Sequence, residues 1–310
     1  MTLVTRWTGV ETRALRLAKR MTIEAFAEHL GVSDRMVSKW ESGGGDVVPR
    51  QVNQAALDTS LACSNSDVQG RFASIVATPP TDAAAVQPAP DLQQSQHVRH
   101  PVDGKLMTKI GEGVFMSGSK NEPQWLESYY IDVFPVTNAD YARFVAATGH
   151  PAPRHWEEKG RCSDRLWDHP VVWVTWRDAA TYAAWAGKAL PSSHQWEKAA
   201  RGTAGAIYPW GDQPTVAKCN VRESGIGETT PVSRYHSGVS PLGVYDMCGN
   251  TWEWCSTETE PGRYELKGSA FTSPFFRCVP AEYNDASIDM YDDDTGFRCV
   301  ALCEQMEARH

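Results

Sequence analysis

The stretch MTIEAFAEHLGVSDRMVSKWESG, residues 21–43, contains two short amphipathic segments on either side of a single glycine. Thr22 can cap the first segment, whose apolar residues recur at the three- and four-residue spacing of one helical face. Gly31 permits the positive φ that ends a helix and turns the chain sharply. Ser33 can cap the second segment. The stretch therefore predicts two short helices joined by a tight turn.

The second of these helices has an apolar side and a polar side. Val37 and Trp40 are expected to face inward, which leaves the polar residues outward together. In a helix-turn-helix, the second helix enters the major groove of DNA. The stretch resembles the Cro/C1 (XRE) type of this motif over about residues 8–44. By that resemblance, the residues expected to reach bases or phosphates of double-stranded DNA are Ser33, Arg35, Ser38 and Lys39.

The sequence on both sides extends this helical region to residue 76. Residues 9–20 predict a helix with one apolar face, made of Val10, Ala14, Leu17 and Ala18. Residues 50–76 predict two more helices, whose apolar residues complete the small bundle or form a dimer contact; they are Leu57, Leu61, Val68, Phe72 and Ile75. We therefore expect residues 1–76 to be an all-α DNA-binding domain. A homodimer is expected because this motif type reads paired half-sites, and a three-helix bundle for protein contacts is the alternative.

Charge and composition divide the chain in two. Residues 1–50 hold eight Lys/Arg and six Asp/Glu, so they carry +2 and the remainder carries −10 of the net −8. A basic head can meet phosphate, whereas an acidic body cannot. Residues 77–102 are rich in Pro, Ala and Gln and predict a linker. No apolar run approaches about 18 residues, so no membrane association is expected and the predicted location is the cytoplasm.

The second half, residues 103–303, has short apolar bursts separated by Gly, Pro, Asn and Asp. It predicts helices at 138–148, 177–186 and 192–201, with short strands and many loops elsewhere. The last seven residues, 304–310, are expected to be a tail. Periodicity alone does not assemble these elements into a fold.

Five ordered segments of this half resemble the formylglycine-generating-enzyme (sulfatase-modifying factor) family. They are DVFPVTNADYARFV, HPVVWVTWRDAATYAAWAGKALPSSHQWEKAARG, YPWGD, GVYDMCGNTWEW and TGFRC. The resemblance covers about Leu106 to Val300. It implies an irregular, C-type-lectin-like α+β fold. The predicted fold class is therefore multidomain, an all-α helix-turn-helix domain followed by this α+β domain.

Family members that oxidise cysteine to formylglycine with O2 bind copper through two cysteines five positions apart, after Gly-Gly-Ser. By direct spacing, Ser273 stands at the first of these positions and Cys278 at the second. If Arg277 is aligned on the arginine that follows the pair, both cysteines are missing. A hydroxyl cannot replace a thiolate as a ligand of a soft metal, so copper-oxidase activity is not expected. Iron is not expected either, because related family members hold it through histidines of a separate helical domain, which has no counterpart in this sequence.

Calcium is the cofactor that the resemblance favours, as a structural ion held by loop oxygens. One family site falls on residues 246–253, with carboxylates from Asp246 and Glu253 and carbonyls from Gly249 and Thr251. The alternative for this segment is a hydrogen-bonded turn. A second family site begins at Asn220 and Val221, with a carbonyl from Ile226, but Ser224 stands where a carboxylate is expected.

The acidic run at 283–295, YNDASIDMYDDDT, could bind a cation or form a recognition surface with neighbouring aromatic residues. A solvated loop is the alternative. Three functions remain open. The favoured one is a DNA-binding regulator whose second domain binds a ligand or protein. The others are a metal- and O2-dependent enzyme of the superfamily and a lectin-like interaction protein.

Overall fold

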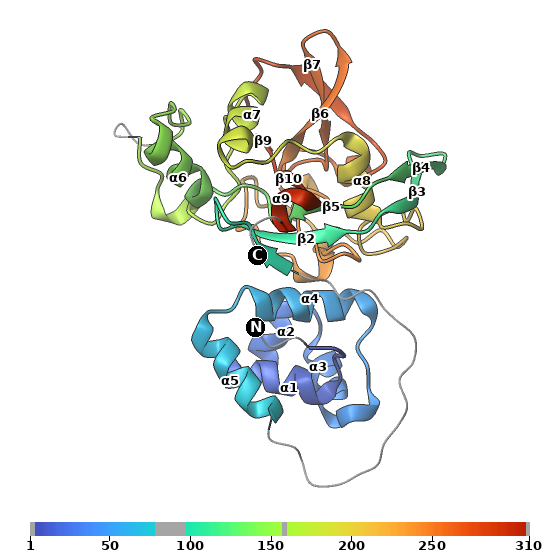
Figure 1. Ribbon diagram of the computed structural model, residues 1–310. Helices are drawn as coiled ribbons and strands as arrows, with labels where there is room; N and C mark the ends of the chain where they lie inside the picture. Colours follow the sequence, from blue (N-terminus) through green and yellow to red (C-terminus); the bar gives the residue numbers. More distant parts are fainter. Residues whose placement is uncertain (1–3, 78–96, 157–159, 308–310) are drawn as a thin grey trace. The chain divides into compact units, whose positions relative to one another are not determined.

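The structure is a computed structural model that describes residues 4–77, 97–156 and 160–307 (Figure 1). The chain divides into two compact units, Met1–Gln96 and His97–His310. The predicted linker residues 78–96 lie outside the described residues. The second unit begins before residue 103, because β1 (His97–Arg99) pairs antiparallel with β2 (Leu106–Ile110).

The first unit is all-α, as the sequence predicted. Its elements are α1 (Gly9–Ala18), α2 (Ile23–Leu30), α3 (Asp34–Ser42), the 3-10 turn η1 (Gly44–Asp46), α4 (Gln51–Ala62) and α5 (Ser66–Ala77). Thr22 and Ser33 cap α2 and α3 by accepting backbone N–H groups. Gly31 ends α2 with φ +66°, the left-handed conformation that glycine adopts without steric cost. The local signals for these helices are confirmed.

The core of the first unit corrects one predicted face. Leu15 is fully buried, whereas Leu17 is 44% exposed and Val10 is 38% exposed. Leu17 lies two residues beyond Leu15 and so about 200° around the helix axis from it. The buried side of α1 instead packs with Trp7, which precedes the helix, and with residues from the other helices, namely Phe26, Val37, Trp40, Leu57, Leu61 and Phe72. Ile75 was also predicted to pack in the bundle or at a dimer contact, and its side chain is 38% exposed.

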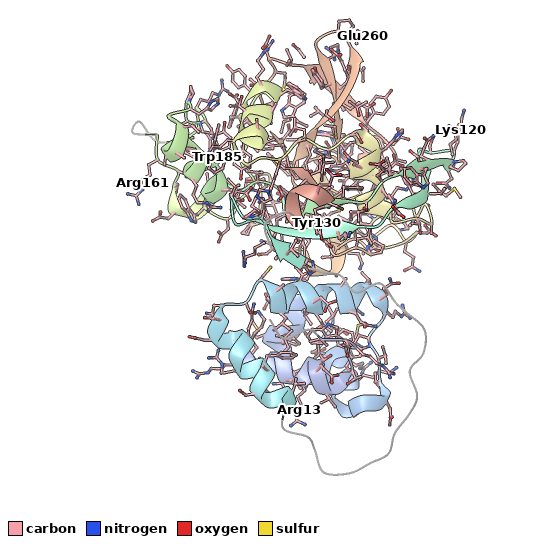
Figure 2. The ribbon with its side chains drawn as sticks, viewed as in Figure 1. Arg13, Lys120, Tyr130, Arg161, Trp185 and Glu260 are labelled. Carbon is pink, nitrogen blue, oxygen red and sulfur yellow. The ribbon has the colours of Figure 1, made fainter. Side chains whose placement is uncertain are left out.

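The second unit is built on two four-stranded sheets and one hairpin. One sheet is antiparallel, in the order β1-β2-β5-β10, with β5 at Tyr129–Asp132 and β10 at Val300–Leu302. The other has the order β8-β7-β6-β9 and contains β6 (Trp252–Glu260), β7 (Arg263–Lys267), β8 (Asn284–Ser287) and β9 (Thr295–Gly296). Strands β3 (Gly113–Ser117) and β4 (Glu122–Leu126) form the separate hairpin. Figure 2 shows Glu260 at the far end of the β6–β7 hairpin.

Helices flank these sheets at the positions that the sequence predicted. They are α6 (Asn138–Thr148), α7 (Trp176–Trp185) and α8 (Ser193–Arg201). A further short helix, α9 (Cys303–Glu307), begins one residue before the predicted tail and continues into it. Short 3-10 turns interrupt the loops at Asp164–Leu166, Val216–Lys218, Arg222–Ser224, His236–Gly238 and Phe275–Arg277. Thr137, Thr175 and Ser192 close capping boxes at the starts of α6, α7 and α8. Aromatic rings from α6 and α7 pack at the centre of the core, including Tyr141, Phe144 and Tyr182.

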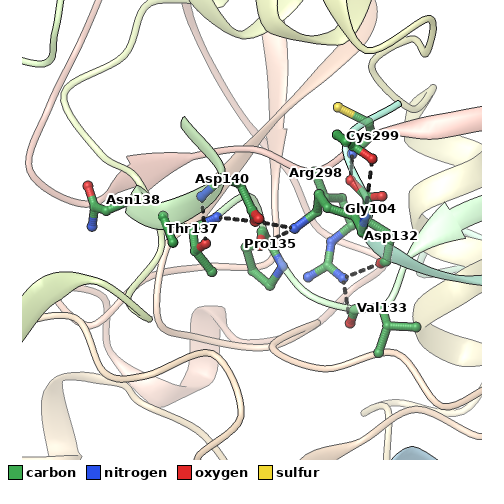
Figure 3. Close-up of polar contacts among 12 residues, drawn as sticks. Gly104, Asp132, Val133, Pro135, Thr137, Asn138, Asp140, Arg298 and Cys299 are labelled. Atoms are coloured by element: carbon green, nitrogen blue, oxygen red, sulfur yellow. Dashed lines mark hydrogen bonds and ion pairs between the residues drawn. The ribbon is translucent and has the colours of Figure 1, made fainter. Parts of the chain in front are cut away.

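Charged residues form a buried network around Asp132, the last residue of β5 (Figure 3). Lys188 Nζ lies 2.8 Å from carboxylate oxygens of both Asp103 and Asp132, and all three side chains are inaccessible to solvent. The second oxygen of Asp132 accepts the backbone N–H of Cys299 at 3.0 Å. Nearby, Lys105 pairs with Asp140 at 2.6 Å. Because a buried charge is tolerated only when it is paired, this network ties the start of the unit to its last strand.

Candidate functional site

Helix α3 presents the predicted DNA-reading residues to solvent. Ser33, Arg35, Ser38 and Lys39 are all exposed. Within the described part of the chain, neither Arg35 nor Lys39 makes an ion pair with a carboxylate. Both cations therefore remain available for a phosphate or a base edge, which is the requirement for reading DNA from a helix.

Helix α3 is fixed to the rest of the first unit. Arg16 donates from Nε and Nη2 to the two carboxylate oxygens of Glu41 in α3, at 2.6 and 2.7 Å. The same arginine donates to the carbonyl of Met21 at 3.0 Å, just before α2. This bidentate arginine–carboxylate pair is one of the stronger ion-pair geometries. Together with buried Trp40, it sets the orientation of the exposed face of α3.

At the positions of the family's copper-binding cysteines, Ser273 and Cys278 are both buried. The thiol that lies beside Cys278 belongs to Cys219, with 3.8 Å between the two Sγ atoms. Cys248 Sγ donates to the carbonyl oxygen of Cys278 at 3.0 Å. Burial raises the pKa of Cys278, and the contact with Cys278 followed by burial raises that of Cys219, so both thiols are held protonated.

Sequence reasoning missed this thiol cluster. Cys219 and Cys278 are 59 residues apart and form no CxxC pair, so their spacing carries no signal. Soft metals favour thiolates, and this cluster brings together the thiols of Cys219, Cys248 and Cys278. The residues at the family's own two positions offer one thiol and one hydroxyl. They do not fit the copper site of the oxidases.

The first predicted calcium site is a buried turn in which one carboxylate already has a cation. Glu253 accepts from Arg298 Nε and Nη2 at 2.6 and 2.7 Å, and from the indole N–H of Trp196 at 2.7 Å. Arg298 also donates to the carbonyl of Tyr245 at 2.8 Å. Both oxygens of Glu253 are therefore engaged. The donor set does not fit a calcium ion as long as Arg298 pairs with Glu253.

The other residues of this turn are arranged by local hydrogen bonds. Asp246, φ +53°, accepts from Asn250 at 2.8 Å, and burial raises the pKa of its carboxyl to about 7. The carbonyl of Gly249 accepts the N–H of Thr251 at 3.0 Å. A Cβ at Gly249 would lie 2.4 Å from the carbonyl oxygen of Asn220, so only glycine fits there.

The second predicted calcium site is closed by a hydrogen bond. The hydroxyl of Ser224 donates to Oδ1 of Asn220 at 2.9 Å, and Asn220 donates to the carbonyl of Glu228 at 2.9 Å. Val221 is fully buried beside them. The serine that replaces the expected carboxylate thus uses the amide oxygen that calcium would need, and this set does not fit calcium either.

The acidic run at 283–295 divides into two groups. Asp285 and Asp289 pair with Arg263 and Arg177, at 2.6 and 3.2 Å. Asp292, Asp293 and Asp294 instead gather with carboxylate oxygens within 4.8 Å of one another. The hydroxyl of Thr272 donates to Asp294 in a short hydrogen bond. Exposed aromatic side chains lie in the same part of the sequence, namely Phe276, Tyr283 and Tyr291.

Two residues outside this run join the acidic group, and the sequence analysis did not single them out. The backbone N–H of Trp173 donates to the carbonyl of Asp292 at 2.8 Å. The guanidinium of Arg154 stacks on the Trp173 indole, with Cζ 3.6 Å from the ring centroid. Trp173 has φ +61°, which is unusual for so large a side chain. No local sequence pattern predicts either contact.

No helix in the described residues is long and apolar enough to cross a membrane.

Comparisons with known proteins agree with this division of the chain. The family model described as "Sulfatase-modifying factor enzyme 1-like domain" matches residues 92–302, more than half of the chain, and a "Helix-turn-helix" model matches residues 13–50. Formylglycine-generating enzyme of Streptomyces coelicolor is 34% identical over 243 residues, covering 60% of this chain and 77% of that protein. Serine/threonine-protein kinase Pkn1 of Chlamydia trachomatis is 39% identical over 145 residues, covering 42% of this chain.

The match to Pkn1 and to two further curated relatives covers only 23% to 38% of their length. Among solved structures, PvdO from Pseudomonas aeruginosa matches with a TM-score of 0.58 and 21% identity, over 68% of this chain and 100% of that one. At that identity, the likeness shows the fold alone. The fusion of a helix-turn-helix with a mixed α/β unit of the formylglycine-generating-enzyme type is confirmed.

Proposed function

The chain belongs to the sulfatase-modifying factor enzyme 1-like family through its second unit, and we propose that it is a DNA-binding regulator whose second unit binds a ligand or protein. The observation that carries the proposal is the exposed cationic face of α3, where Arg35 and Lys39 make no ion pair with any residue that the structure describes. Cytoplasmic residence goes with it, because DNA is the first unit's partner.

The contacts of α3 support a reading role more than a protein-contact role. Arg35 and Lys39 are four residues apart, so they lie on the same side of the helix. Val37 and Trp40 are buried within the unit, and Met36, 40% exposed, is the large apolar residue of α3 that faces solvent. One exposed methionine leaves little apolar surface there for a protein partner. A cationic, polar helix face fits the phosphate-rich edge of a groove.

Loss of cysteine oxidation is the second part of the proposal. Ser273 offers a hydroxyl where the family's oxidases need a thiolate, and Cys278 packs against Cys219 instead. Without the family's two copper-binding cysteines, the second unit keeps the family fold and serves as a binding domain. The same fold can host different functions, so the family fold does not by itself imply the family's reaction.

The thiol pair of Cys219 and Cys278 favours one alternative, a metal- and O2-dependent enzyme that uses a rearranged thiolate site. The experiment that separates the two functions measures O2 uptake by the purified full chain with a cysteine-containing sulfatase-type peptide, after addition of Cu(I) or Fe(II). We expect no uptake above the rate without protein. Uptake that Cys219→Ser abolishes would replace the regulator proposal with the enzyme.

The DNA-binding half is tested by duplex affinity as a function of salt. We expect the logarithm of the association constant to fall linearly with the logarithm of salt concentration, and the slope to shrink by about 1 in Lys39→Ala if this side chain contacts phosphate. Binding to DNA with no preference for any sequence would favour a lectin-like interaction protein with an accessory charged head. No binding at all would remove the regulator proposal.

A further inference from the structure

One face of the β3–β4 hairpin is apolar and open to solvent (Figure 1). The strands pair so that Val114 lies opposite Trp125 and Met116 lies opposite Pro123. Residues opposite each other, and residues two apart in a strand, point to the same side of a sheet, so these four form one surface, the hairpin face. Val114 is 49% exposed and Trp125 is 57% exposed. Pro123 is exposed as well, and Met116 is half-buried.

The opposite side of the hairpin is the side that packs on the second unit. Phe115 is fully buried and Ser117 is buried near it. The ring of Phe115 meets the imidazole of His194 in α8 edge-on, with 6.1 Å between the centroids. Packing of the hairpin on α8 therefore does not account for the apolar residues of the hairpin face. An exposed tryptophan grouped with other apolar side chains is typical of a surface that binds a partner.

A buried arginine fixes the hairpin in place. Arg201 of α8 pairs with Glu197 at 2.6 Å, and both side chains are buried. Arg201 also donates to the carbonyl of Gly118 at 3.1 Å and to Oδ1 of Asn121 at 2.8 Å, both in the turn of the hairpin. Oε1 of Glu197 accepts the backbone N–H of Gly118 at 2.7 Å. The hairpin face is therefore held in one orientation, which lowers the entropy cost of binding a partner.

The chemistry of the hairpin favours a helix over an added strand as that partner. Within the described residues, β3 and β4 form a sheet of two strands, so the sheet has open edges. Pro123 in β4 has no N–H to donate, which weakens the addition of a further strand there. A helix needs no backbone hydrogen bonds from the hairpin, because it can pack an apolar stripe of side chains on the hairpin face.

The charge around the hairpin face favours a cationic helix. Residues 112–127 contain three acids and one base, all exposed, namely Glu112, Glu122, Glu127 and Lys120. From residue 97 to residue 310 the sequence has 28 Asp/Glu against 21 Lys/Arg. An acidic surface attracts cationic segments and repels nucleic acid and anionic lipid. It also disfavours a second copy of the chain, because that copy would bring carboxylates to the same place.

We propose that the hairpin face binds an amphipathic, cationic helix of a partner protein. The inference rests on the proposed role of the second unit as a binding domain, and it names the surface and the chemistry of the partner. Trp125 and Val114 pack on the apolar stripe of the helix. Glu112 and Glu127, which flank the open end of the hairpin, attract its Lys or Arg residues.

The test uses the full chain and a fluorescently labelled, capped peptide of Leu and Lys at helical spacing, with binding measured by anisotropy at 0.15 M salt. We expect Trp125→Thr to weaken binding about ten-fold or more, the value of one aromatic anchor. Val114→Thr, which replaces one methyl group by a hydroxyl, is expected to weaken it about two- to five-fold. Threonine keeps the strand propensity of both positions, and an unchanged melting temperature verifies that the hairpin stays folded.

Matched controls separate the hairpin face from general stickiness and charge. Trp167→Thr removes a tryptophan that is 42% exposed outside the hairpin. Glu260→Gln removes an exposed carboxylate at the end of the β6–β7 hairpin (Figure 2). Both are expected to leave peptide affinity unchanged, whereas Glu112→Gln/Glu127→Gln is expected to weaken it about two-fold or more. A peptide with Glu in place of Lys is expected to bind at least ten-fold more weakly than the Leu/Lys peptide.

Three outcomes would overturn the proposal. The first is peptide affinity that Trp125→Thr leaves unchanged, or lowers no more than Trp167→Thr does. The second is a dimer of the free chain in sedimentation equilibrium that Trp125→Thr dissociates, because a second copy would then occupy the hairpin face. The third is equal affinity for the Leu/Lys and Leu/Glu peptides, because the acidic surroundings would then select no charge.

The same protein samples are tested for DNA retention, which separates the two proposals. DNA retention without peptide binding contradicts the helix-binding hairpin face and leaves the regulator standing. Peptide binding that depends on Trp125, without DNA retention, supports the hairpin face as the site of a binding domain and contradicts the proposed role of the first unit.

Discussion

Helix α3 and the turn at Asp246–Glu253 differ in how their charged residues are paired. Arg35 and Lys39 stand in solvent without an ion pair in the described residues, on a helix held from behind by Arg16 and Glu41. In the turn, Glu253 is buried and already paired with Arg298 of the same unit. The comparison teaches that a charged residue is open to a ligand only if the fold has not supplied its counter-ion.

The largest expected effect follows from removing the internal cation of the turn. Arg298→Met leaves the Glu253 carboxylate buried without its partner, which costs about 3–5 kcal/mol of folding free energy. Urea denaturation followed by tryptophan fluorescence measures it, because ten of the 12 tryptophans lie in the second unit. Arg263→Met, which breaks the solvent-exposed pair with Asp285, serves as the control and is expected to change little. Equal losses in the two variants would show that Glu253 does not depend on Arg298.

The next effect is the pH dependence of the carboxyl of Asp246. Burial raises its folded pKa to about 7, above the unfolded value, so the folded state binds the extra proton and stability falls as pH rises from about 4 through 7. Asp246→Asn lacks this loss and is expected to be more stable than the wild type at pH 8, on the order of 3 kcal/mol. Below pH 4 the two proteins should be equally stable. Thermal denaturation across this pH range measures the difference.

Calcium sharpens that prediction. Because Arg298 already neutralises Glu253, we expect 5 mM calcium, about the weak end of protein affinities, to leave the melting temperature of the wild type unchanged at pH 8. A calcium-dependent rise that Asp246→Asn removes would mean that the turn binds the ion after all. In that case, the difference between the turn and α3 would be smaller than the structure indicates.

A smaller effect is expected at the reading face. Arg35→Ala should weaken binding to a preferred duplex by about 1–3 kcal/mol if the side chain reads a base, and should relax the preference at that position. Arg13→Ala is the charge-matched control from the exposed side of α1 (Figure 2). It can alter the salt dependence but is expected to keep the sequence preference. Identical preferences in both variants and the wild type would show that Arg35 does not read a base.

The smallest effect concerns the start of α3. Ser33 Oγ accepts the N–H of Met36 at 3.3 Å, so Ser33→Ala should cost about 1 kcal/mol of stability through loss of the cap. Ser33→Asn keeps a capping oxygen and is expected to keep both stability and DNA affinity. If Ser33→Asn loses DNA affinity at unchanged stability, Ser33 contacts DNA directly in addition to capping the helix.

Local signals explain how much of the fold the sequence could predict. Helix caps and tight turns act within a few residues, as at Thr22, Gly31 and Ser33. The helices that begin or end at these residues, α2 and α3, are confirmed. The face of α1 was misjudged at Leu17, because which side of a helix is buried depends on where its neighbours pack. The same limit applies to the second unit, in which helices were predicted but the order of the sheet strands was not.

Contacts between distant residues explain why the candidate sites were predicted less well. Arg298 meets Glu253 from 45 residues further along the chain, so no spacing rule indicates that the expected calcium ligand is already paired. Cys219 and Cys278 meet across a similar gap, and Arg154 reaches the acidic run through Trp173. By contrast, the exposure of the polar residues of α3 follows from helical periodicity alone and could be predicted, whereas their contact with DNA stays a prediction.

The central claim is that the first unit reads DNA sequence through α3. Its most direct test is selection of duplexes from a random library by the full-length chain, with Arg35→Ala selected in parallel. The account predicts enrichment of one sequence by the wild type, arranged as two half-sites if the chain dimerises, and a weaker or altered enrichment by the variant. Recovery of no common sequence, at low salt and with folded protein, would contradict it.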